Sequence, residues 1–303
     1  MTSPRQTLSF LRNRFHEAGI RPDTRHGQNF LFDLNLIDLL ADSAELTRQD
    51  VVLEVGTGTG SLTTRMAALA GHVVTVEIDP QLLSLASEAF VEFDNITVLH
   101  QDVLRNKNNI QANVLETLQE KMSAIPGARF KLAANLPYNI ATPVISNLLA
   151  WELVPALLAV TIQKELADRI LARPSTKDYG ALSVWVQSLA DPEIIRILPP
   201  DVFWPKPKVH SAILRIRTCE EKRKQIPDVD FFHQFVRALF FHRRKFLRSV
   251  LRSAFKTELQ KQEVDQVLAE LDISGEVRAE QLEVGDIQRM CTAFGSYLAR
   301  RSL

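Results

Sequence analysis

A short apolar run that leads directly into a glycine-rich turn limits the folds open to this chain. Residues 51–55 read Val-Val-Leu-Glu-Val, and the turn that follows is Gly56-Thr-Gly-Thr-Gly60. Apolar residues then recur at helical spacing, at Leu62, Met66 and Leu69. This order predicts a buried strand, a tight turn and a helix, which is the repeating unit of a sheet with crossover helices.

The glycine spacing indicates what the turn holds. Alternate glycines let the backbone approach a ligand, and the helix amino terminus favours polar or anionic groups. The pattern is Gly-x-Gly-x-Gly, without the third glycine of the dinucleotide fingerprint Gly-x-Gly-x-x-Gly. This favours S-adenosylmethionine over NAD, with Gly56 and Gly58 as contacts. An ordinary tight turn is the alternative reading of this loop taken alone.

Two further apolar runs end in acidic residues. Residues 72–78 carry Glu77 near their end, and residues 95–100 lead into Asp102. A carboxylate at Glu77 can accept both ribose hydroxyls, as the acid about 20 residues past a nucleotide-binding glycine loop does. Asp102 can accept from the adenine amino group of the same cofactor. Each acid alone could instead cap a helix.

A fourth apolar run, residues 130–134, ends in Asn135-Leu-Pro-Tyr138. The N6 amine of adenine is a poor nucleophile because its lone pair is delocalised into the ring, so a catalyst needs hydrogen-bond acceptors that draw the lone pair out. The Asn135 side-chain oxygen and a backbone carbonyl beside Pro137 can do this, since proline fixes φ and offers no N–H. We assign Asn135, Leu136, Pro137 and Tyr138 as the catalytic motif, with Tyr138 stacking on the base. A strand ending in a proline turn with a buried tyrosine is the alternative.

Together these motifs resemble the ribosomal RNA adenine N6,N6-dimethyltransferase family, whose bacterial small-subunit enzyme dimethylates two adjacent adenines near the 3′ end of 16S rRNA. The similarity covers almost the whole chain. The matching segments are Gly27–Leu31, Val52–Gly56, Val76–Asp79, Gln101–Val103, Asn135–Val144, Gln163–Glu165, Tyr179–Ser183, Phe203–Ala212 and Arg243–Lys245.

The resemblance implies a Rossmann-like S-adenosylmethionine-dependent methyltransferase with no metal. It also implies a 16S rRNA substrate within a precursor of the 30S particle, and we expect a monomer. The family's cofactor contacts fall on Asn29, Leu31, Gly56, Glu77, Asp102 and Asn135.

Two alternatives stay open. One is a 23S rRNA adenine N6-methyltransferase, and the other is a non-catalytic RNA-binding assembly or transcription factor on the same fold. The segment Leu271–Leu282 resembles the closing motif of the small-subunit branch and favours that branch. The intact set of Glu77, Asp102 and Asn135–Tyr138 argues against lost catalysis.

The chain departs from the family in three places. Thr57 stands where the glycine turn usually has proline, and the lead Thr24–Gln28 carries less positive charge than is usual. Residues 104–128 are extended, with apolar residues at helical spacing that predict a surface helix docked on the sheet rim, and an added RNA contact as the less favoured option.

The remaining pattern predicts two domains. We expect a catalytic domain over residues 1–219, with a flexible N-terminal arm (1–30) and an entry helix around residues 34–46, and a helical RNA-binding domain over residues 220–303. Residues 193–198 and 211–217 predict an antiparallel hairpin that ends the mostly parallel sheet. The Pro-rich loop between them carries Phe203, which we expect to face Tyr138 across the extruded adenine. The charged stretch 220–225 reads as a linker.

The net charge of zero places any RNA contact in local clusters of Lys and Arg. Arg244, Arg248, Arg252 and Lys256 are spaced four apart and predict one basic ridge on a helix, which we interpret as an RNA contact. A solvated helix face is the alternative. A second basic set, near the amino terminus, comprises Arg5, Arg12, Arg14, Arg21 and Arg25.

Composition fits a two-domain globular protein. The chain has 303 residues with 46% hydrophobic content, and no run reaches the roughly 20 apolar residues of a membrane span. The first residues lack an apolar signal core, and Cys219 and Cys291 form no metal-binding motif. We therefore expect a cytoplasmic protein without a disulfide framework or a structural zinc.

Overall fold

The structure, a computed structural model, describes residues 8–22 and 27–301. Contacts within the chain divide it into two units. The first comprises Met1–Ala167 and Glu193–Thr218, and the second comprises Asp168–Pro192 and Cys219–Leu303. Residues 168–192 thus group with the C-terminal part, whereas we place a single boundary at residue 219. Two independently folding domains stay a prediction.

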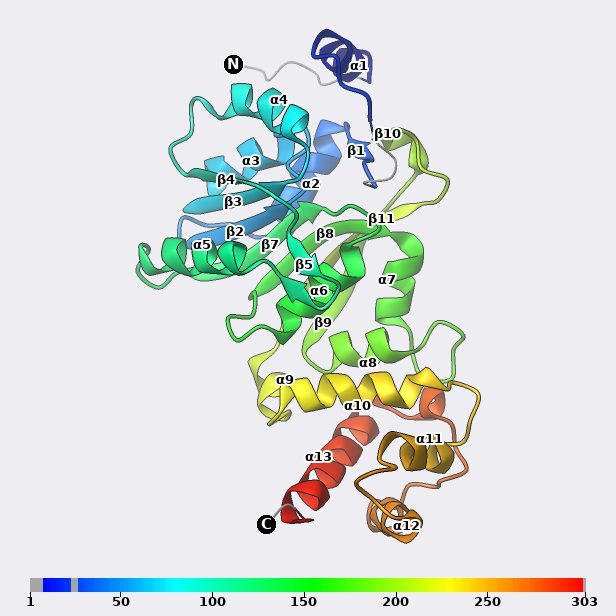
Figure 1. The fold of residues 1–303 in the computed structure, drawn as a ribbon. Helices are drawn as coiled ribbons and strands as arrows, with labels where there is room; N and C mark the ends of the chain where they lie inside the picture. The colour runs from blue at the N-terminus through cyan, green and yellow to red at the C-terminus, as the bar shows by residue number, and fades with distance from the viewer. Residues whose placement is uncertain (1–7, 23–26, 302–303) are drawn as a thin grey trace. The chain divides into compact units, whose positions relative to one another are not determined.

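The first unit is built on a seven-stranded sheet (Figure 1) with the order β4-β3-β2-β7-β8-β11-β9. The strands from β4 to β8 run parallel, and β11 pairs antiparallel with β8. This confirms the mostly parallel sheet with a terminal antiparallel pair. The strands are β2 (Asp50–Val55), β3 (His72–Glu77), β4 (Ile96–His100), β7 (Arg129–Asn135), β8 (Leu157–Gln163), β9 (Ala190–Leu198) and β11 (Ser211–Thr218).

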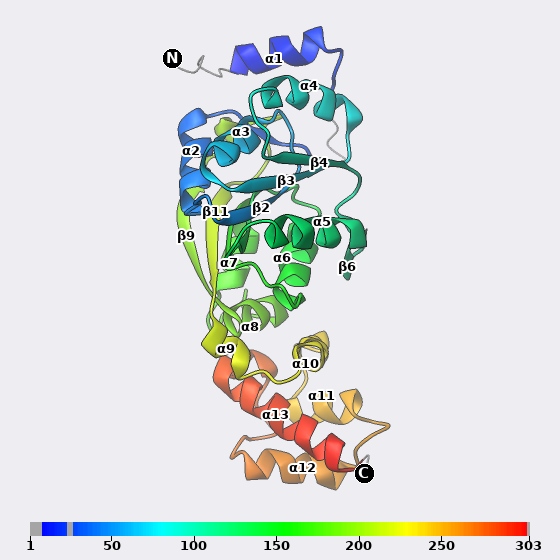
Figure 2. The same ribbon diagram turned by 90° about the vertical axis from the view of Figure 1, so that its left-hand side faces the viewer.

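Helices cover both faces of this sheet. Figures 1 and 2 show α2 and α3 on one face and α5 and α6 on the other. Because both faces are covered, the central strands read as continuous apolar runs rather than alternating ones. The helices are α2 (Leu34–Ser43), α3 (Ser61–Leu69), α4 (Pro80–Phe90), α5 (Ala112–Ser123), α6 (Ala141–Ala150) and α7 (Lys164–Leu171).

The strand order reverses beside β2. From β2 the chain moves outward through β3 to β4, and it then returns to place β7 on the other side of β2. In open parallel sheets the crevice at such a reversal, beyond the carboxyl ends of the strands, is where ligands bind. The ends of β2 and β7 are therefore the place to look for a site.

The N-terminal region contains a packed helix, α1 (Leu8–Glu17), so our expectation of a flexible arm is wrong for these residues. Leu11 and Phe15 are buried, and the Phe15 ring meets the Phe30 ring edge-on at 5.0 Å between centroids. Phe30 belongs to β1 (Phe30–Leu31), which pairs with β10 (Phe203–Trp204). Residues 1–7 and 23–26 of the arm lie outside the described residues.

The extended segment after β4 contains more than the single helix that we predict. A small hairpin of β5 (Leu104–Asn106) and β6 (Asn109–Ile110) precedes α5. The helix itself docks as expected, with Val114 and Leu118 fully buried. The hairpin strands are too short to show a two-residue hydrophobic period, so the sequence pattern does not reveal them.

The second unit is helical and has its own aromatic core. The Phe255 and Phe294 rings stack at 5.2 Å between centroids, and the Trp185 and Phe232 rings stack at 6.2 Å. Its elements are α8 (Ala181–Gln187), α9 (Glu220–Lys224), α10 (Val229–Phe241), α11 (Leu247–Ala254), α12 (Lys261–Glu270), the 3-10 turn Ala279–Gln281 and α13 (Val284–Arg301).

The charged stretch that we interpret as a linker is in fact the short helix α9. Glu220 and Lys224 form an ion pair of 2.8 Å at i,i+4 spacing, which supports a helical turn.

Across the described ranges, no helix has both the length and the apolar character needed to cross a membrane.

A buried ion pair fixes the start of the two central strands. Asp50 in β2 is fully buried and Lys131 in β7 is 4% exposed, and Lys131 Nζ lies 3.1 Å from Asp50 Oδ2. The same ammonium donates to the carbonyls of Ala44 and Glu45 at 3.0 and 2.6 Å. Arg129 Nε lies 3.0 Å from the other Asp50 oxygen, at the surface end of the pair.

We expect Asp50→Asn to lower the free energy of unfolding by about 3–5 kcal/mol, because it leaves the Lys131 ammonium buried without its counter-charge. Urea denaturation measures this difference. Arg129→Gln is the matched control: its side chain is 49% exposed, so its loss should cost no more than about 1 kcal/mol. Equal losses in the two variants would show that burial of the pair does not govern stability here.

Candidate functional site

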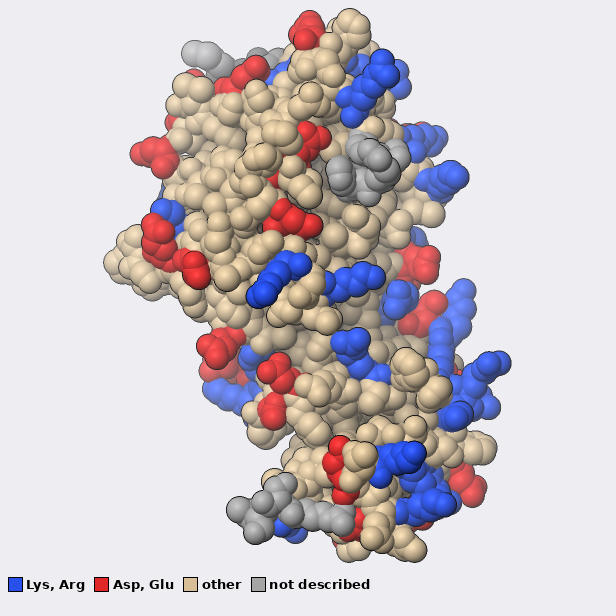
Figure 3. Space-filling view, in the orientation of Figure 1, with Lys and Arg blue, Asp and Glu red and all other residues tan. Residues whose placement is uncertain are grey.

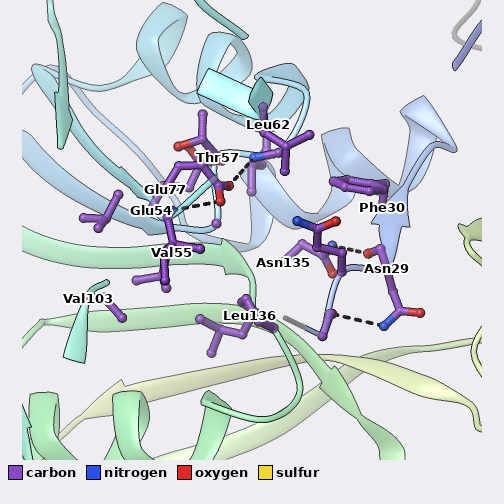
Figure 4. A pocket seen from close by; sticks show the side chains of 18 of the residues that line it. Asn29, Phe30, Glu54, Val55, Thr57, Leu62, Glu77, Val103, Asn135 and Leu136 are labelled. Carbon is purple, nitrogen blue, oxygen red and sulfur yellow. Dashed lines mark hydrogen bonds between the residues drawn. The ribbon is translucent and has the colours of Figure 1, made fainter. Parts of the chain in front are cut away.

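A cavity opens at the strand reversal, and five segments of the first unit supply most of its lining (Figure 4). They are the β1 region, the turn after β2, the end of β3, the residues after β4 and the residues after β7. It therefore gathers Asn29, Leu31, Gly56, Gly58, Glu77, Asp102, Asn135, Leu136 and Pro137 from the predicted site.

The turn after β2 requires its glycines. Gly56, Gly58 and Gly60 have φ of 84°, 56° and 79°, in the left-handed region that other residues rarely adopt. A Cβ at Gly56 would lie 3.5 Å from the Pro137 ring, and one at Gly58 would lie 3.3 Å from the Phe30 ring. The glycines thus bring β2, β7 and β1 close together around the cavity.

Glu77 is buried at the end of β3 and is held by backbone N–H groups. Its Oε2 accepts from Gly58 at 3.0 Å, and its Oε1 accepts from Ile78 and Asp79 at 2.9 and 3.0 Å. Burial raises the pKa of Glu77, and these three donors act against that rise. A carboxylate has roughly four acceptor positions, so about one remains for a ligand.

Glu54 is a cavity residue that sequence reasoning missed. It is 1% exposed within β2, and its Oε2 accepts from Thr63 at 2.6 Å and from Thr75 at 2.7 Å. Thr57 of the glycine turn lies 2.6 Å from Thr75, hydroxyl to hydroxyl. The sequence signal that could have identified Glu54 is an acidic residue within the otherwise apolar run 51–55. The turn therefore rests on a buried network of hydroxyls around one carboxyl group.

The Asn135 amide is fixed in orientation by the β1 region. Its Nδ2 donates to the Asn29 carbonyl at 2.9 Å, and the Asn29 side chain donates to the Gly27 carbonyl at 3.1 Å (Figure 4). The other amide atom, Asn135 Oδ1, is buried and has no hydrogen-bond partner among the described residues. A buried acceptor left without a donor carries a cost of about 1–3 kcal/mol, which a ligand N–H can relieve.

The residues after Asn135 present a second acceptor. Leu136 donates its N–H to the Thr161 carbonyl at 3.2 Å, and the Pro137 carbonyl accepts from Ile140 at 3.1 Å. The Leu136 carbonyl receives no hydrogen bond from the residues that the structure describes. It follows Asn135 directly in the chain, at the cavity wall.

Asp102 and Leu31 lie where the sequence predicts. Asp102 is exposed at the cavity, and its Oδ1 accepts from Leu104 N at 2.8 Å, so it also caps the turn into β5. Leu31 is 7% exposed and contributes an apolar surface to the wall.

The structure does not bring the two predicted stacking rings together in the cavity. Tyr138 is half-buried, and its hydroxyl lies 2.6 Å from the Ser211 hydroxyl in β11. Phe203 is 2% exposed and belongs to the core with Leu31, its partner in the β1–β10 pair. This packing buries the ring at the base of the loop, so the stacking role of Phe203 finds no support in its position.

The basic ridge that we predict is wrong in its geometry. Arg244 lies in the turn before α11, and Lys256 follows the end of the helix. Only Arg248 and Arg252 share α11, and both contact Asp265 of α12, at 2.8 and 2.5 Å. The chain breaks the helical repeat at residues 242–246, and an acid distant in sequence neutralises part of the ridge.

The second basic set is only partly described. Arg14 pairs with Glu88 at 2.7 Å, and Arg12 and Arg21 are exposed. Arg5 and Arg25, like residues 24–26 of the lead segment, lie outside the described residues. Within residues 8–22 and 27–301, no three His, Cys, Asp or Glu side chains are placed to hold a metal ion.

The fold and the cavity define the class of protein. A mostly parallel sheet, a glycine turn after one strand, a buried acid at the end of the next and an acceptor-lined cavity at the reversal point together describe a Rossmann-like methyltransferase. The sequence model of the family described as "Ribosomal RNA adenine dimethylase" matches residues 21–294. The chain therefore belongs to the ribosomal RNA adenine dimethylase family.

Similar proteins agree with this assignment. "Ribosomal RNA small subunit methyltransferase A" of Streptococcus mutans is 40% identical over 268 residues, which cover 88% of this chain and 89% of that protein. The protein of the same name from Ligilactobacillus salivarius is 39% identical, over 88% of both chains.

Two solved structures share the fold. A dimethyladenosine transferase from Plasmodium falciparum superposes with a TM-score of 0.73 at 22% identity, covering 86% of this chain and 96% of that one. The 23S rRNA methyltransferase ErmE superposes with a TM-score of 0.61 at 24% identity, covering 88% and 100%. At these identities the likeness concerns the fold.

Burial raises the pKa of Glu54 from 4.5 to about 8, which makes stability depend on pH. The folded state holds the Glu54 proton more tightly than the unfolded state does. The stability that this group contributes is therefore complete below about pH 4.5 and is lost as the pH rises toward about 8. We expect Glu54→Gln, which cannot ionise, to remove a dependence of at most about 1.4 kcal/mol per pH unit in this window. Urea denaturation of both proteins between pH 5 and 8 tests this, and parallel stability curves would contradict it.

Proposed function

We propose that this protein transfers methyl groups from S-adenosylmethionine to N6 of two adjacent adenines near the 3′ end of 16S rRNA. The observation that carries the proposal is the buried, partnerless Oδ1 of Asn135 in the cavity wall. An exocyclic amine with two hydrogens would meet this oxygen and the neighbouring Leu136 carbonyl. Two acceptors on one nitrogen draw its lone pair out of conjugation and toward a methyl carbon.

The residues on the donor side of the cavity fit S-adenosylmethionine. The left-handed glycine turn opens a close backbone approach, Glu77 keeps about one acceptor position for a ribose hydroxyl, and Asp102 can accept from the adenine amino group. This revises our expectation that Glu77 accepts both ribose hydroxyls. The bound sulfonium supplies an activated methyl group, so the protein's part is to place N6 in line with it.

The substrate side requires an extruded base. The N6 atom sits on a base edge, so the adenine leaves its stack and enters the pocket. Tyr138 follows the two acceptors in the chain, and the contact between its hydroxyl and the Ser211 hydroxyl at 2.6 Å restrains its ring. We propose Tyr138 as the stacking surface, without Phe203, whose ring is buried in the core.

The partners follow from the substrate. The relatives named small subunit methyltransferase A support 16S rRNA rather than 23S rRNA as the target. We further propose that the protein acts as a monomer on a precursor of the 30S particle, in the bacterial cytoplasm where ribosomes assemble. Incubation with S-adenosylmethionine and unmethylated small-subunit particles, followed by mass spectrometry of rRNA fragments, tests this. Methylation confined to large-subunit RNA would overturn the assignment.

Asn135→Ala should abolish methyl transfer while RNA binding persists, because its oxygen acts on the amine in the transition state. Such a loss lowers kcat and kcat/KM together. Steady-state kinetics and an RNA-binding assay measure the two effects separately. Asn135→Asp is a useful companion, because it keeps an acceptor at Oδ1 but removes the amide that donates to Asn29. A normal kcat in Asn135→Ala would remove Asn135 from the catalytic step.

Glu77→Ala should weaken S-adenosylmethionine binding by roughly 10- to 100-fold, since it removes a charge-assisted hydrogen bond worth about 1.5–3 kcal/mol. Calorimetry with the purified protein measures this. Glu92→Ala serves as the control, because Glu92 is an exposed acid that does not line the cavity. A folded Glu77 variant with unchanged affinity would contradict the role.

A further inference from the structure

Thr161 of β8 carries a buried hydroxyl group that packing of the sheet does not require. The side chain is 0% exposed, and its Oγ1 has no hydrogen-bond partner among the described residues. The other buried positions of β8, residues 157–160 and 162, are all apolar. Burying an unpaired hydroxyl costs free energy, and a valine of nearly the same shape would fill this position without that cost. A partnerless hydroxyl here therefore calls for a role outside packing.

Thr161 lies beside the two acceptors of the catalytic motif. In the parallel pair of β7 and β8, Thr161 is level with Asn135, so the two side chains leave the same face of the sheet from strands about 4.8 Å apart. The Thr161 carbonyl also accepts from the N–H of Leu136 at 3.2 Å. One residue of β8 thus borders both residues whose oxygens are assigned to the substrate amine.

The Asn135 amide is held from one side only. Its Nδ2 donates to the Asn29 carbonyl at 2.9 Å (Figure 4), whereas its Oδ1 receives no hydrogen bond from the residues that the structure describes. A carbonyl oxygen has two lone pairs, so Oδ1 can accept from the amine and from a second donor at once. The Thr161 hydroxyl is a donor on the neighbouring strand, and rotation about its Cα–Cβ bond changes the direction in which it points.

We propose that Thr161 is a positioning residue, whose hydroxyl turns toward Asn135 Oδ1 and donates to it while the amine is methylated. The amine nitrogen gains positive charge as the methyl group arrives, and an acceptor stabilises that charge best when its direction is already fixed. The bond from Thr161 fixes the amide from its second side. In the free protein, the same hydroxyl stays buried without a partner. This inference rests on the proposed function, because it takes Oδ1 as the acceptor of the amine.

Thr161→Val removes the hydroxyl and keeps the shape of the side chain. We expect kcat to fall roughly 2- to 12-fold, the rate equivalent of one neutral hydrogen bond, with unchanged KM for RNA and for S-adenosylmethionine. The free protein should nevertheless melt at the wild-type temperature or above it, because valine removes a buried polar group that has no partner. Thr161→Ser keeps the hydroxyl and should keep a kcat near that of the wild type. A role in packing alone predicts the opposite order, with the smaller serine as the damaged variant.

Ser188→Ala is the matched control. Ser188 belongs to the second unit and is 1% exposed, and its Oγ likewise has no hydrogen-bond partner in the described ranges. Its loss should leave kcat unchanged. Neither buried substitution alters the charged surface that Figure 3 shows, so the salt dependence of RNA binding should stay at the wild-type value in both variants.

Steady-state kinetics and thermal melts of the full chain decide the matter together. A wild-type kcat in Thr161→Val would overturn the positioning role, and so would an equal loss of kcat in Ser188→Ala. A valine variant that melts well below the wild type, or that does not fold, would show that the hydroxyl already serves the free protein and would also overturn it.

The wild-type protein tests the proposed function separately. If it methylates small-subunit adenines and Thr161→Val matches its rate, the role of Thr161 alone is wrong. If it methylates only large-subunit RNA, the proposed target is wrong, and the ratio of the two rates on that RNA still decides the role of Thr161. A wild type that methylates no adenine would overturn both.

Discussion

The register between β2 and β7 is the constraint on which the site depends. In this parallel pair Asp50 lies level with Arg129 and Leu53 lies level with Leu132, and the buried contact between Asp50 and Lys131 belongs to this register alone. A slip of one residue would turn every side chain of one strand to the opposite face. It would also separate the glycine turn from the asparagine motif. The ion pair near the amino ends of β2 and β7 thus secures the alignment of the chemical groups at their carboxyl ends.

The sequence allowed the sheet and the cavity to be predicted because each of these strands carries a cavity-lining residue at or just past its last apolar position. Gly56, Glu77, Asp102 and Asn135 could all be found in this way, and the parallel topology brings them together. The sequence did not identify Glu54 as a cavity residue because it lies inside a strand. An acid there suggests an interruption of the apolar run rather than a carboxyl group bound by hydroxyls. Its partners Thr63 and Thr75 come from two other elements, and no local pattern links them.

Two predictions failed where tertiary contacts override local pattern. The charges at residues 244, 248, 252 and 256 have a helical repeat, but α10 ends at Phe241 and α11 begins only at Leu247, so the repeat spans a turn. We predict that Phe203, in a proline-rich loop, faces the extruded base, yet its two-residue strand pairs with β1 and its ring belongs to the core. Both failures come from pairing partners that are distant in the sequence.

The two acceptors beside Pro137 also bear on when the reaction ends. An unmodified adenine amine can satisfy Asn135 Oδ1 and the Leu136 carbonyl with its two hydrogens, but each methyl group replaces one of them. Under the proposed function, the doubly methylated base has no hydrogen left to donate, and both oxygens become partnerless again at a cost of about 1–3 kcal/mol each. The pocket that attracts the substrate therefore disfavours the finished product. The same pair of oxygens then sets the number of methyl transfers at two and favours release of the dimethylated product.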